Sequence, residues 1–374
     1  DFMERVQGLP TLEAVCEAAA RDVRRLTGFD RVLIYRFDDD DTGVVIAEDN
    51  SGALPGLLHH RFPASDIPKQ ARELYRLNRL RIIPDAGYTP VPIRAAAGTA
   101  DPLDLTYSML RSVSPVHLEY MRNMGTAASM SVSILVDGRL WGLISCHNAE
   151  PKAVALQVRA SCDFLAQVLA LQVGALERTA QSARRVELKS LQAELLTLMA
   201  QEEVFSDALV KNPGLWRALV SADGAALVAG DTIMTAGQTP NHAQIRRIVG
   251  WLERGDKSDV FATDCLANEM PEAEDLIESA SGLVALAISE VHPSYILWFR
   301  PEHVRTIPWA GEPAKLIERD GLIRPRNSFA LWQEQVLSPK DRCRFRQCWR
   351  AAAARNIRGS DMRDFMAIGR SVAV

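Results

Sequence analysis

The spacing of apolar and polar positions in the first fifty residues predicts a helix followed by two strands. Over residues 11–27, apolar side chains recur every three or four positions, which is typical of an amphipathic helix. The apolar runs at residues 31–37 and 44–47 favour strands. The acidic run at 38–41 separates them, and we interpret it as a solvated turn because no nearby residues complete a set of metal ligands.

The pattern that follows completes a first α+β domain. Helical spacing is expected over residues 69–80 and 104–124, with an ordered loop rich in Pro, Gly and Asp at 84–104. Alternating polarity over 129–146 predicts a hairpin, in which Asp137-Gly138 supplies the positive φ that a two-residue turn demands. This order of elements favours an antiparallel sheet with helices on its faces.

Residues 154–203 predict one long helix. The segment contains no Pro and a single Gly, and leucines mark an apolar stripe along it. At about 1.5 Å per residue such a helix would be roughly 75 Å long, which exceeds the size of one domain. We therefore expect it to connect two domains and to offer a seam for a homodimer.

The second half repeats the layout of the first. A hairpin is expected over residues 223–236, a helix over 244–253, and strands over 282–290 and 295–299. Residues 300–328 are rich in Pro, Gly, Arg and Trp, with weak periodicity, and so long an irregular excursion is usually functional. The predicted fold class is α+β, with two related sandwich domains joined by the long helix.

Composition narrows the class of protein. The chain has 374 residues, 47% hydrophobic and 24% charged, and a net charge of −4, which is ordinary for a globular protein and argues against nucleic-acid binding. The sequence has no apolar run of membrane-spanning length and no signal-peptide pattern. Six scattered cysteines without a CxxC pair suit reduced thiols, and we expect a cytoplasmic protein.

The motifs of several enzyme classes are missing. GxSxG, HExxH and GxGxxG do not occur. Gly250 and Gly255 have P-loop spacing, but Asp256 stands where a phosphate-binding Lys is needed and would repel phosphate. We therefore expect a binding protein and not an enzyme.

Three segments combine special backbone with polar groups in apolar surroundings. In residues 61–68, two prolines bracket Ser65-Asp66 and favour an extended shape, although a simple turn before a helix is the alternative. In residues 110–120, His117 and Tyr120 would share one helix face, although His117 could equally be a core histidine. Residues 141–148 form an apolar strand ending in polar groups, which suits either a cavity edge or a plain strand end.

Taken together, these segments resemble the bacterial phytochromes. PASDIP at 63–68, LRSVSPVHLEYMRNMG at 110–125 and LWGLISCHN at 140–148 resemble the phytochrome GAF signature. Three later segments, at 298–302, 309–313 and 325–329, are similar to the tongue of the PHY domain. The resemblance implies a GAF domain over 1–170, a connecting helix over 171–203, and a PHY domain over 204–374 with its tongue at about 295–335.

The resemblance also implies a ligand, a biliverdin-type linear tetrapyrrole. The backbone carbonyl of Asp66 would face the pyrrole N–H groups, and His117 would lie beside them and titrate with the chromophore. His147 would hydrogen-bond the carbonyl of the outer D ring. Two further sets of residues match family positions: those for the propionates are Tyr75, Arg81, Arg111, Ser114, Ser129 and Ser131, and those for the wall of the D-ring site are Tyr35, Phe62, Ile67 and Tyr120. Pro68 is also expected to contact the chromophore.

The mechanism implied by the resemblance is photochemical. Light would isomerise the double bond between rings C and D, and the Asp66 carboxylate would exchange Arg326 for Ser328 as its partner. That exchange would refold the tongue and pass a signal through the long helix to the dimer partner and to an output or response-regulator partner.

The sequence departs from parts of the family at the attachment site. Val116 precedes His117, so the thiol that plant-type and cyanobacterial members carry there is absent. The alternative bacterial attachment site lies in a PAS domain that this chain lacks, and no covalent site is found in it. Two other functions remain open: a pigment-free GAF–PHY dimerisation module, and the input half of a sensor histidine kinase, whose catalytic module would lie outside this chain.

Overall fold

The hairpins expected near the start and near residue 140 form the centre of the first sheet. β1 (Arg31–Phe37) pairs antiparallel with both β2 (Gly43–Asn50) and β6 (Arg139–Asn148), and β6 pairs with β5 (Ala128–Val136). The turn between β5 and β6 has φ values of 50° at Asp137 and 76° at Gly138, as the sequence predicts. The full strand order is β13-β12-β3-β2-β1-β6-β5-β4.

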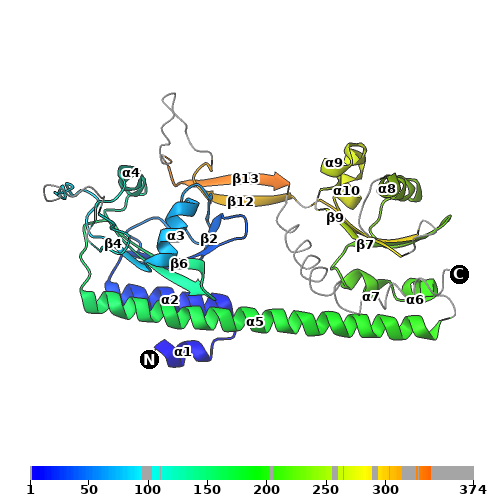
Figure 1. The fold of residues 1–374 in the computed structure, drawn as a ribbon, viewed down its shortest axis with the longest axis horizontal. Helices are drawn as coiled ribbons and strands as arrows, with labels where there is room; N and C mark the ends of the chain where they lie inside the picture. Colours follow the sequence, from blue (N-terminus) through cyan, green and yellow to red (C-terminus); the bar gives the residue numbers. More distant parts are fainter. Residues whose placement is uncertain are drawn as a thin grey trace. The chain divides into compact units, whose positions relative to one another are not determined.

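The computed structural model describes residues 2–94, 103–109, 111–202, 205–254, 260–263, 265–288, 294–302, 304–313, 326 and 328–337. Within it the chain divides into two compact units. The first comprises Asp1–Gln181 and Ile307–Glu334, and the second is built on Ser182–Thr306 (Figure 1). The helix α5 (Leu156–Gln201) contributes to both units. The α+β class predicted from the sequence is confirmed.

The two faces of the first sheet bury different sets of side chains. Val32 and Ile34 of β1 pack into a core with α2 (Leu12–Thr27) and the first part of α5, whereas Leu33 and Tyr35 face a second apolar cluster. This alternation is the period of two that a strand imposes. Figure 1 shows α2 and α5 along one face, with α3 (Lys69–Leu77) and α4 (Pro115–Asn123) on the other side.

Two helix predictions in this unit were too long. The helix expected at 104–124 is only α4, because Ser114 precedes Pro115 and adopts an extended ψ of 130°. The helix expected at 69–80 ends at Leu77, and the chain then forms β4 (Leu80–Ile83), which pairs with β5. Pairing with a distant strand outweighed the local helical pattern there. Short elements at the edges are α1 (Phe2–Gln7) and β3 (Arg61–Phe62).

The second unit has its own five-stranded antiparallel sheet, in the order β8-β7-β11-β10-β9. The expected hairpin is β7 (Gly224–Ala229) and β8 (Thr232–Gly237), and β10 (Gly282–Ala287) pairs with β11 (Ser294–Arg300). Apolar clusters lie on both faces of this sheet. Its other elements are α6 (Phe205–Lys211), α7 (Pro213–Ala218), α8 (His242–Arg254), β9 (Val260–Thr263), α9 (Leu266–Glu269), the 3₁₀-helix η1 (Pro271–Leu276) and α10 (Ile277–Ala280).

The excursion after residue 300 is more regular than expected. It includes β12 (Val304–Ala310), and the chain returns as β13 (Leu331–Leu337) to pair with it. β12 pairs parallel with β3 through Trp309 and Arg61. Residues 314–325 and 338–374 and the rejected P-loop position Asp256 lie outside the described residues.

Two further findings bear on function. No helix in the described part of the chain is both long enough and apolar enough to cross a bilayer. Among the same residues, no three His, Cys, Asp or Glu side chains gather where they could bind a metal ion.

The glycine at position 43 on β2 leaves room for the ring of Tyr35. A Cβ built there would overlap the ring of Tyr35, which is buried against Phe62 with ring centroids 5.7 Å apart. We expect Gly43→Ala to displace the Tyr35 ring and to lower the free energy of unfolding by about 1–3 kcal/mol. Urea unfolding measures this, with Gly56→Ala as the control because its added Cβ meets only Glu48 at 3.7 Å. Equal stability of the two variants would contradict the prediction.

Candidate functional site

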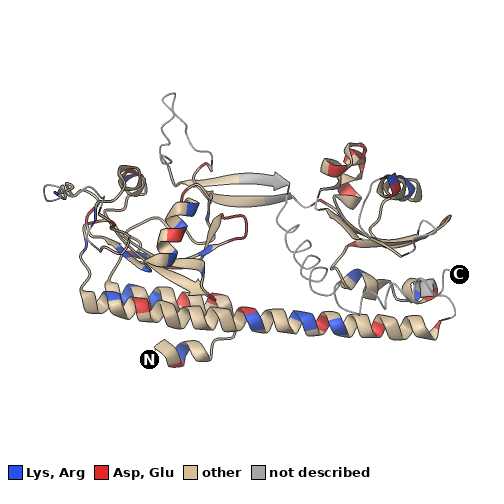
Figure 2. Ribbon diagram, in the orientation of Figure 1, with Lys and Arg blue, Asp and Glu red and all other residues tan. Residues whose placement is uncertain are grey.

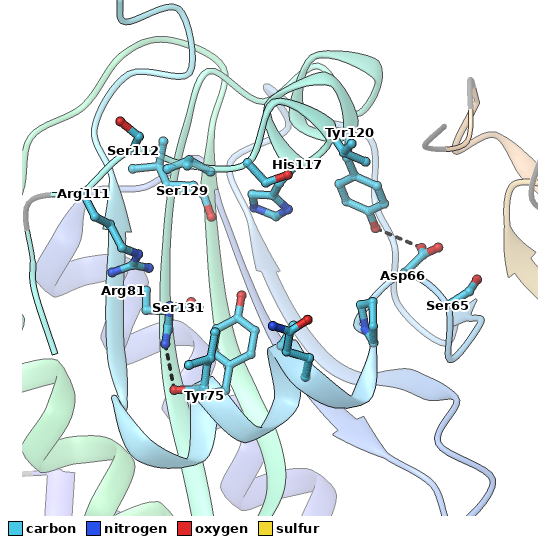
Figure 3. Close-up of a pocket in the computed structure, with 18 residues that line it drawn as sticks. Ser65, Asp66, Tyr75, Arg81, Arg111, Ser112, His117, Tyr120, Ser129 and Ser131 are labelled. Carbon is cyan, nitrogen blue, oxygen red and sulfur yellow. Dashed lines mark hydrogen bonds between the residues drawn. The ribbon is translucent and has the colours of Figure 1, made fainter. Parts of the chain in front are cut away.

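A cavity of about 450 Å³ opens between α3, α4 and the strands β4 and β5. The Pro-bracketed turn at Ser65-Asp66 bounds one side, and the loop before α4 bounds another (Figure 3). Ten of the side chains predicted from the sequence line it: Asp66, Pro68, Tyr75, Arg81, Arg111, Ser114, His117, Tyr120, Ser129 and Ser131. Segments far apart in the sequence are therefore brought to one cavity.

One end of this cavity is cationic. Arg81 on β4 donates to the Leu74 carbonyl at 2.7 Å and lies over the Tyr75 ring at 5.2 Å, but its Nε is buried without a hydrogen-bond partner. Burial, and then the nearby guanidinium of Arg111, lower the pKa of Arg81. Two like charges beside an unsatisfied N–H, with Ser114, Ser129 and Ser131 on the same lining, form a site prepared for anionic groups.

The opposite end is organised around the Asp66 carboxylate. The Asp66 backbone N–H donates to the Pro63 carbonyl at 3.0 Å, which fixes the turn. Tyr120 donates its hydroxyl to Oδ2 of Asp66 at 3.1 Å, and Arg326 forms an ion pair with the same oxygen (Figure 3). The side chains of Asp66 and Arg326 are only 4% and 3% exposed, so this is a buried pair.

Arg326 is also held by groups at the end of β12 and just before β13. Its guanidinium donates to the carbonyls of Ala310 and Gly311 and lies 4.9 Å from the Phe329 ring centroid. Its own carbonyl accepts from Asn123 of α4 at 3.0 Å. Ser328 is exposed, and its hydroxyl accepts from the Ala330 N–H at 3.2 Å. In this structure, then, Arg326 is the partner of Asp66, and Ser328 has a local hydrogen bond.

His117 lies on the cavity lining, stacked on Tyr120 with ring centroids 6.0 Å apart and planes 10° apart. Burial lowers the pKa of His117 below its ordinary value. Burial likewise raises the pKa of Tyr120 well above its usual range, and the Asp66 carboxylate adds to this. At neutral pH both side chains are therefore neutral hydrogen-bonding groups.

The lowered pKa of His117 predicts a pH-dependent stability for the pigment-free protein. Below about pH 6.5 the unfolded chain binds a proton at this position that the folded chain does not, so stability is lost as pH falls. We expect His117→Gln to reduce that loss by up to about 1.4 kcal/mol per pH unit. Urea unfolding between about pH 5 and 8 measures it, and His242→Gln, at an exposed position, is the control. An unchanged slope in His117→Gln would contradict the assignment.

Four of the predicted residues do not line the cavity. Tyr35, Phe62 and Ile67 belong to the apolar cluster that also contains Tyr75 and Phe329, which lies beside the cavity because Tyr75 belongs to both. His147 is buried, with Nδ1 3.1 Å from Arg31 and Nε2 3.1 Å from the hydroxyl of Ser145.

Several lining residues were missed by the sequence analysis. α3 presents Gln70, Ala71 and Leu74, and their spacing with Tyr75 places them on one helix face, a signal the sequence does contain. Ser112 and Val113 come from the segment before α4, Val116 comes from the first turn of α4, and Ser65 and Ile83 complete the lining. Val116 is half exposed in the position where a thiol would be needed for covalent attachment.

Comparisons with known proteins agree with this architecture. A sequence profile of the GAF domain matches residues 11–176, and a profile described as the phytochrome region, PHY, matches residues 188–360. Cyanobacterial phytochrome B of Nostoc is 45% identical over 90% of this chain and 45% of its own length. A bacteriophytochrome of Xanthomonas campestris is 38% identical over 90% of this chain and 55% of its own length. The chain thus spans about half the length of these curated relatives.

Two solved structures are similar throughout most of their length. The bacteriophytochrome RpBphP3 of R. palustris matches with a TM-score of 0.75 and 39% identity, over 93% of this chain and 73% of that one. The photosensory core module of the Stigmatella aurantiaca phytochrome matches with a TM-score of 0.73 and 44% identity, over 90% and 68%. The chain belongs to the phytochrome family of photoreceptors, which confirms the resemblance found in the sequence.

Proposed function

We propose that the cavity binds a linear tetrapyrrole of the biliverdin type and that the chain works as a red/far-red light sensor. The observation that carries this is the pair Arg81 and Arg111, whose charges share one cavity wall while Nε of Arg81 is buried without a partner. Burying such groups is costly unless they meet an anion. The two propionates of a bilin supply two carboxylates, and the serines on the lining supply further donors.

Different residues of this chain would bind different parts of the pigment. Arg81, Arg111, Tyr75, Ser114, Ser129 and Ser131 hold the propionates, each charge-assisted hydrogen bond contributing about 1.5–3 kcal/mol. The Asp66 carbonyl and His117 face the pyrrole nitrogens. His117 accepts or returns a proton there because burial keeps it neutral in the empty cavity. The GAF region that supplies these residues is proposed to extend over residues 1–170, and the PHY region over 204–374 with its tongue at about 295–335.

When bound, the pigment supplies light absorption and isomerisation of the double bond between its rings C and D. The protein's part is to define two arrangements of the surroundings. Tyr35, Phe62, Ile67, Pro68 and Tyr120 form the wall and floor beside the outer ring, and His147 donates a hydrogen bond to its carbonyl. These side chains restrict rotation of the outer ring because they are packed against one another, as in the contact between the Tyr35 and Phe62 rings.

The buried Asp66–Arg326 pair is the element that would report the change of state. It joins the turn at the cavity to the carbonyls of Ala310 and Gly311 at the end of β12. Exchange of Arg326 for Ser328 as the partner of Asp66 would release those carbonyls and allow the tongue to refold. A buried ion pair with alternative partners suits such a two-state element.

Expression of the chain together with a haem oxygenase tests the function. We expect a coloured protein whose red and far-red absorbance interconverts under light, and whose pigment is lost on a denaturing gel because no covalent site is found in the chain. The double variant Arg81→Met/Arg111→Met should take up much less pigment. A colourless wild type would instead support a pigment-free dimerisation module, and pigment that survives the gel would reveal a covalent site.

We also propose that α5 forms a homodimer seam and passes the signal to an output partner. Residues 156–176 of this helix carry few charges, and the sequence has more of them from Glu177 onward. Figure 2 shows these charged positions along α5. Phe164 and Leu171, one heptad apart on that first part, are 59% and 72% exposed. The proposed seam is the same whether the output partner is a histidine-kinase module of the same protein or a separate response regulator.

Leu171→Glu is expected to break the proposed dimer. Two Leu side chains would leave the interface, each contributing about 1.5–3 kcal/mol, so dimerisation should weaken by about 3–6 kcal/mol. Analytical ultracentrifugation measures the change, with Leu77→Glu as a control on α3. A dimer that persists in Leu171→Glu with wild-type affinity would rule out this seam.

A further inference from the structure

A buried arginine contacts the histidine proposed to face the outer ring. Arg31 at the start of β1 is 1% exposed, although it carries a guanidinium. Its Nε and Nη2 lie 3.3 and 3.1 Å from Nδ1 of His147. Its remaining donors meet the Pro55 carbonyl and the Met124 sulfur, the latter at 3.4 Å. The register of the sheet enforces this contact, because Arg31 and His147 are directly paired between β1 and β6.

The chemistry of this contact fixes where His147 carries its proton. A guanidinium has five N–H donors and no acceptor, so both of its nitrogens that reach Nδ1 must donate to it. Nδ1 must then be the unprotonated ring nitrogen, and the single proton of the neutral ring lies on Nε2. Nε2 in turn has the hydroxyl of Ser145 at 3.1 Å as its acceptor.

The surroundings also oppose a second proton on the ring. Burial, then the Arg31 charge, then His117 hold the pKa of His147 well below its ordinary value. Arg31 faces the ring from β1, His117 acts on it from α4, and on β5 the residue paired with it is Ser129, which does not titrate in this range. Arg31 itself keeps its charge, since burial lowers its pKa only to about 10 and Glu48 opposes that shift.

We propose that Arg31 is a positioning residue that locks His147 as a neutral imidazole with its proton on Nε2, a permanent hydrogen-bond donor. This inference deepens the proposed function and rests on it only for the acceptor in the pigmented protein, where the outer-ring carbonyl would replace the Ser145 hydroxyl as the partner of Nε2–H. It assigns the pH dependence of the site to His117, because His147 has no free nitrogen at which to gain a proton.

The proton position can be measured without pigment, by ¹⁵N NMR of histidine-labelled protein, with the His147 signals identified by their loss in His147→Gln. We expect the Nε2–H form to exceed the Nδ1–H form by about 10:1 or more, the ratio that a hydrogen bond from a charged donor supports. The His147 signals should not titrate between about pH 5.5 and 8.5, whereas those of an ordinary histidine would. A protonated Nδ1, or titration in that range, would overturn the proposal.

Two variants separate the hydrogen bond from a structural role. Arg31→Met should give a mixture of both tautomers and raise the pKa of His147, whereas Arg31→Lys, which keeps a donor, should retain part of the preference. Arg24→Met, which removes an ion pair between α2 and Asp49 of β2, is the control and should leave the tautomer unchanged. If Arg31→Met does not fold, the wild-type measurement still decides the proposal.

The pigmented protein provides a second readout. Arg31→Met should shift the absorption band and make it pH-dependent, and this shift should vanish in the His147→Gln background. A shift that persists without His147 would show that Arg31 acts on the site by another route. If the chain takes up no pigment but shows the expected tautomer, the proposed function fails while the positioning role of Arg31 stands.

Discussion

Arg326→Ala should lower the free energy of unfolding of the first unit by about 3–5 kcal/mol, the usual cost of removing one partner from a buried ion pair. The change leaves the Asp66 carboxylate, 4% exposed, without the guanidinium that balances its charge, while the Tyr120 hydroxyl still donates to it at 3.1 Å. It also removes the donor to the Ala310 and Gly311 carbonyls. Pigment uptake should change much less, because Arg326 does not line the cavity.

Urea unfolding and hydrogen exchange at the Gly311 amide measure this loss, since that N–H donates to the Ala330 carbonyl at 2.9 Å. Arg72→Ala is the matched control. It removes an ion pair with Asp41, whose side chain is 62% exposed, and should cost about 0–1 kcal/mol. If both variants lose the same stability, the Arg326 pair behaves as a surface contact and cannot be the reporting element.

Asp66→Ala adds the photochemical test of the same pair. We expect pigment still to bind, because the proposed contact uses the Asp66 backbone carbonyl, whereas photoconversion should stall because the carboxylate that exchanges partners is gone. Flash absorbance measures it. A normal photocycle in Asp66→Ala would refute the role given to the carboxylate.

Local chemistry predicted some parts of this fold well. The β5–β6 hairpin follows from alternating polarity and from Asp137-Gly138, both at positive φ. These signals lie within a few residues of the element they determine. β4 and the parallel pairing of β3 with β12 depend instead on strands far along the chain, and no local pattern contains them.

The same distinction applies to the site. Asp66 and His117 were identified because their segments resemble a family signature, and Arg81 because it matches a family position; the lining brings the three together. The burial of Arg31 was not predicted, since an arginine that begins a strand usually reaches solvent. Only the pairing of β1 with β6 shows that it meets His147.

The cationic end of the cavity predicts effects of opposite sign with and without pigment. In the pigment-free protein Arg81 is desolvated and repelled by Arg111, and its Nε has no hydrogen-bond partner from the protein. Arg81→Met should therefore leave the pigment-free protein as stable as wild type or more stable. With pigment, the same change removes charge-assisted hydrogen bonds worth about 1.5–3 kcal/mol each, so affinity should fall by about 10- to 150-fold per bond.

Thermal unfolding of the pigment-free protein measures the effect on stability, and titration with biliverdin measures the effect on affinity. Both are done with the wild type and Arg81→Met. Arg81→Lys is the informative control, because it keeps the charge but loses the planar fork that can bind a carboxylate through two hydrogen bonds. Arg81→Lys should recover part of the affinity that Arg81→Met loses, but it should show none of that variant's gain in stability. If Arg81→Met instead destabilises the empty protein and leaves affinity unchanged, Arg81 is a structural residue and the propionate site lies elsewhere. The effects of Arg81→Met on stability and on affinity must have opposite signs. Arg81 destabilises the pigment-free protein because it is buried without an anion, and it binds the pigment tightly because a propionate supplies that anion.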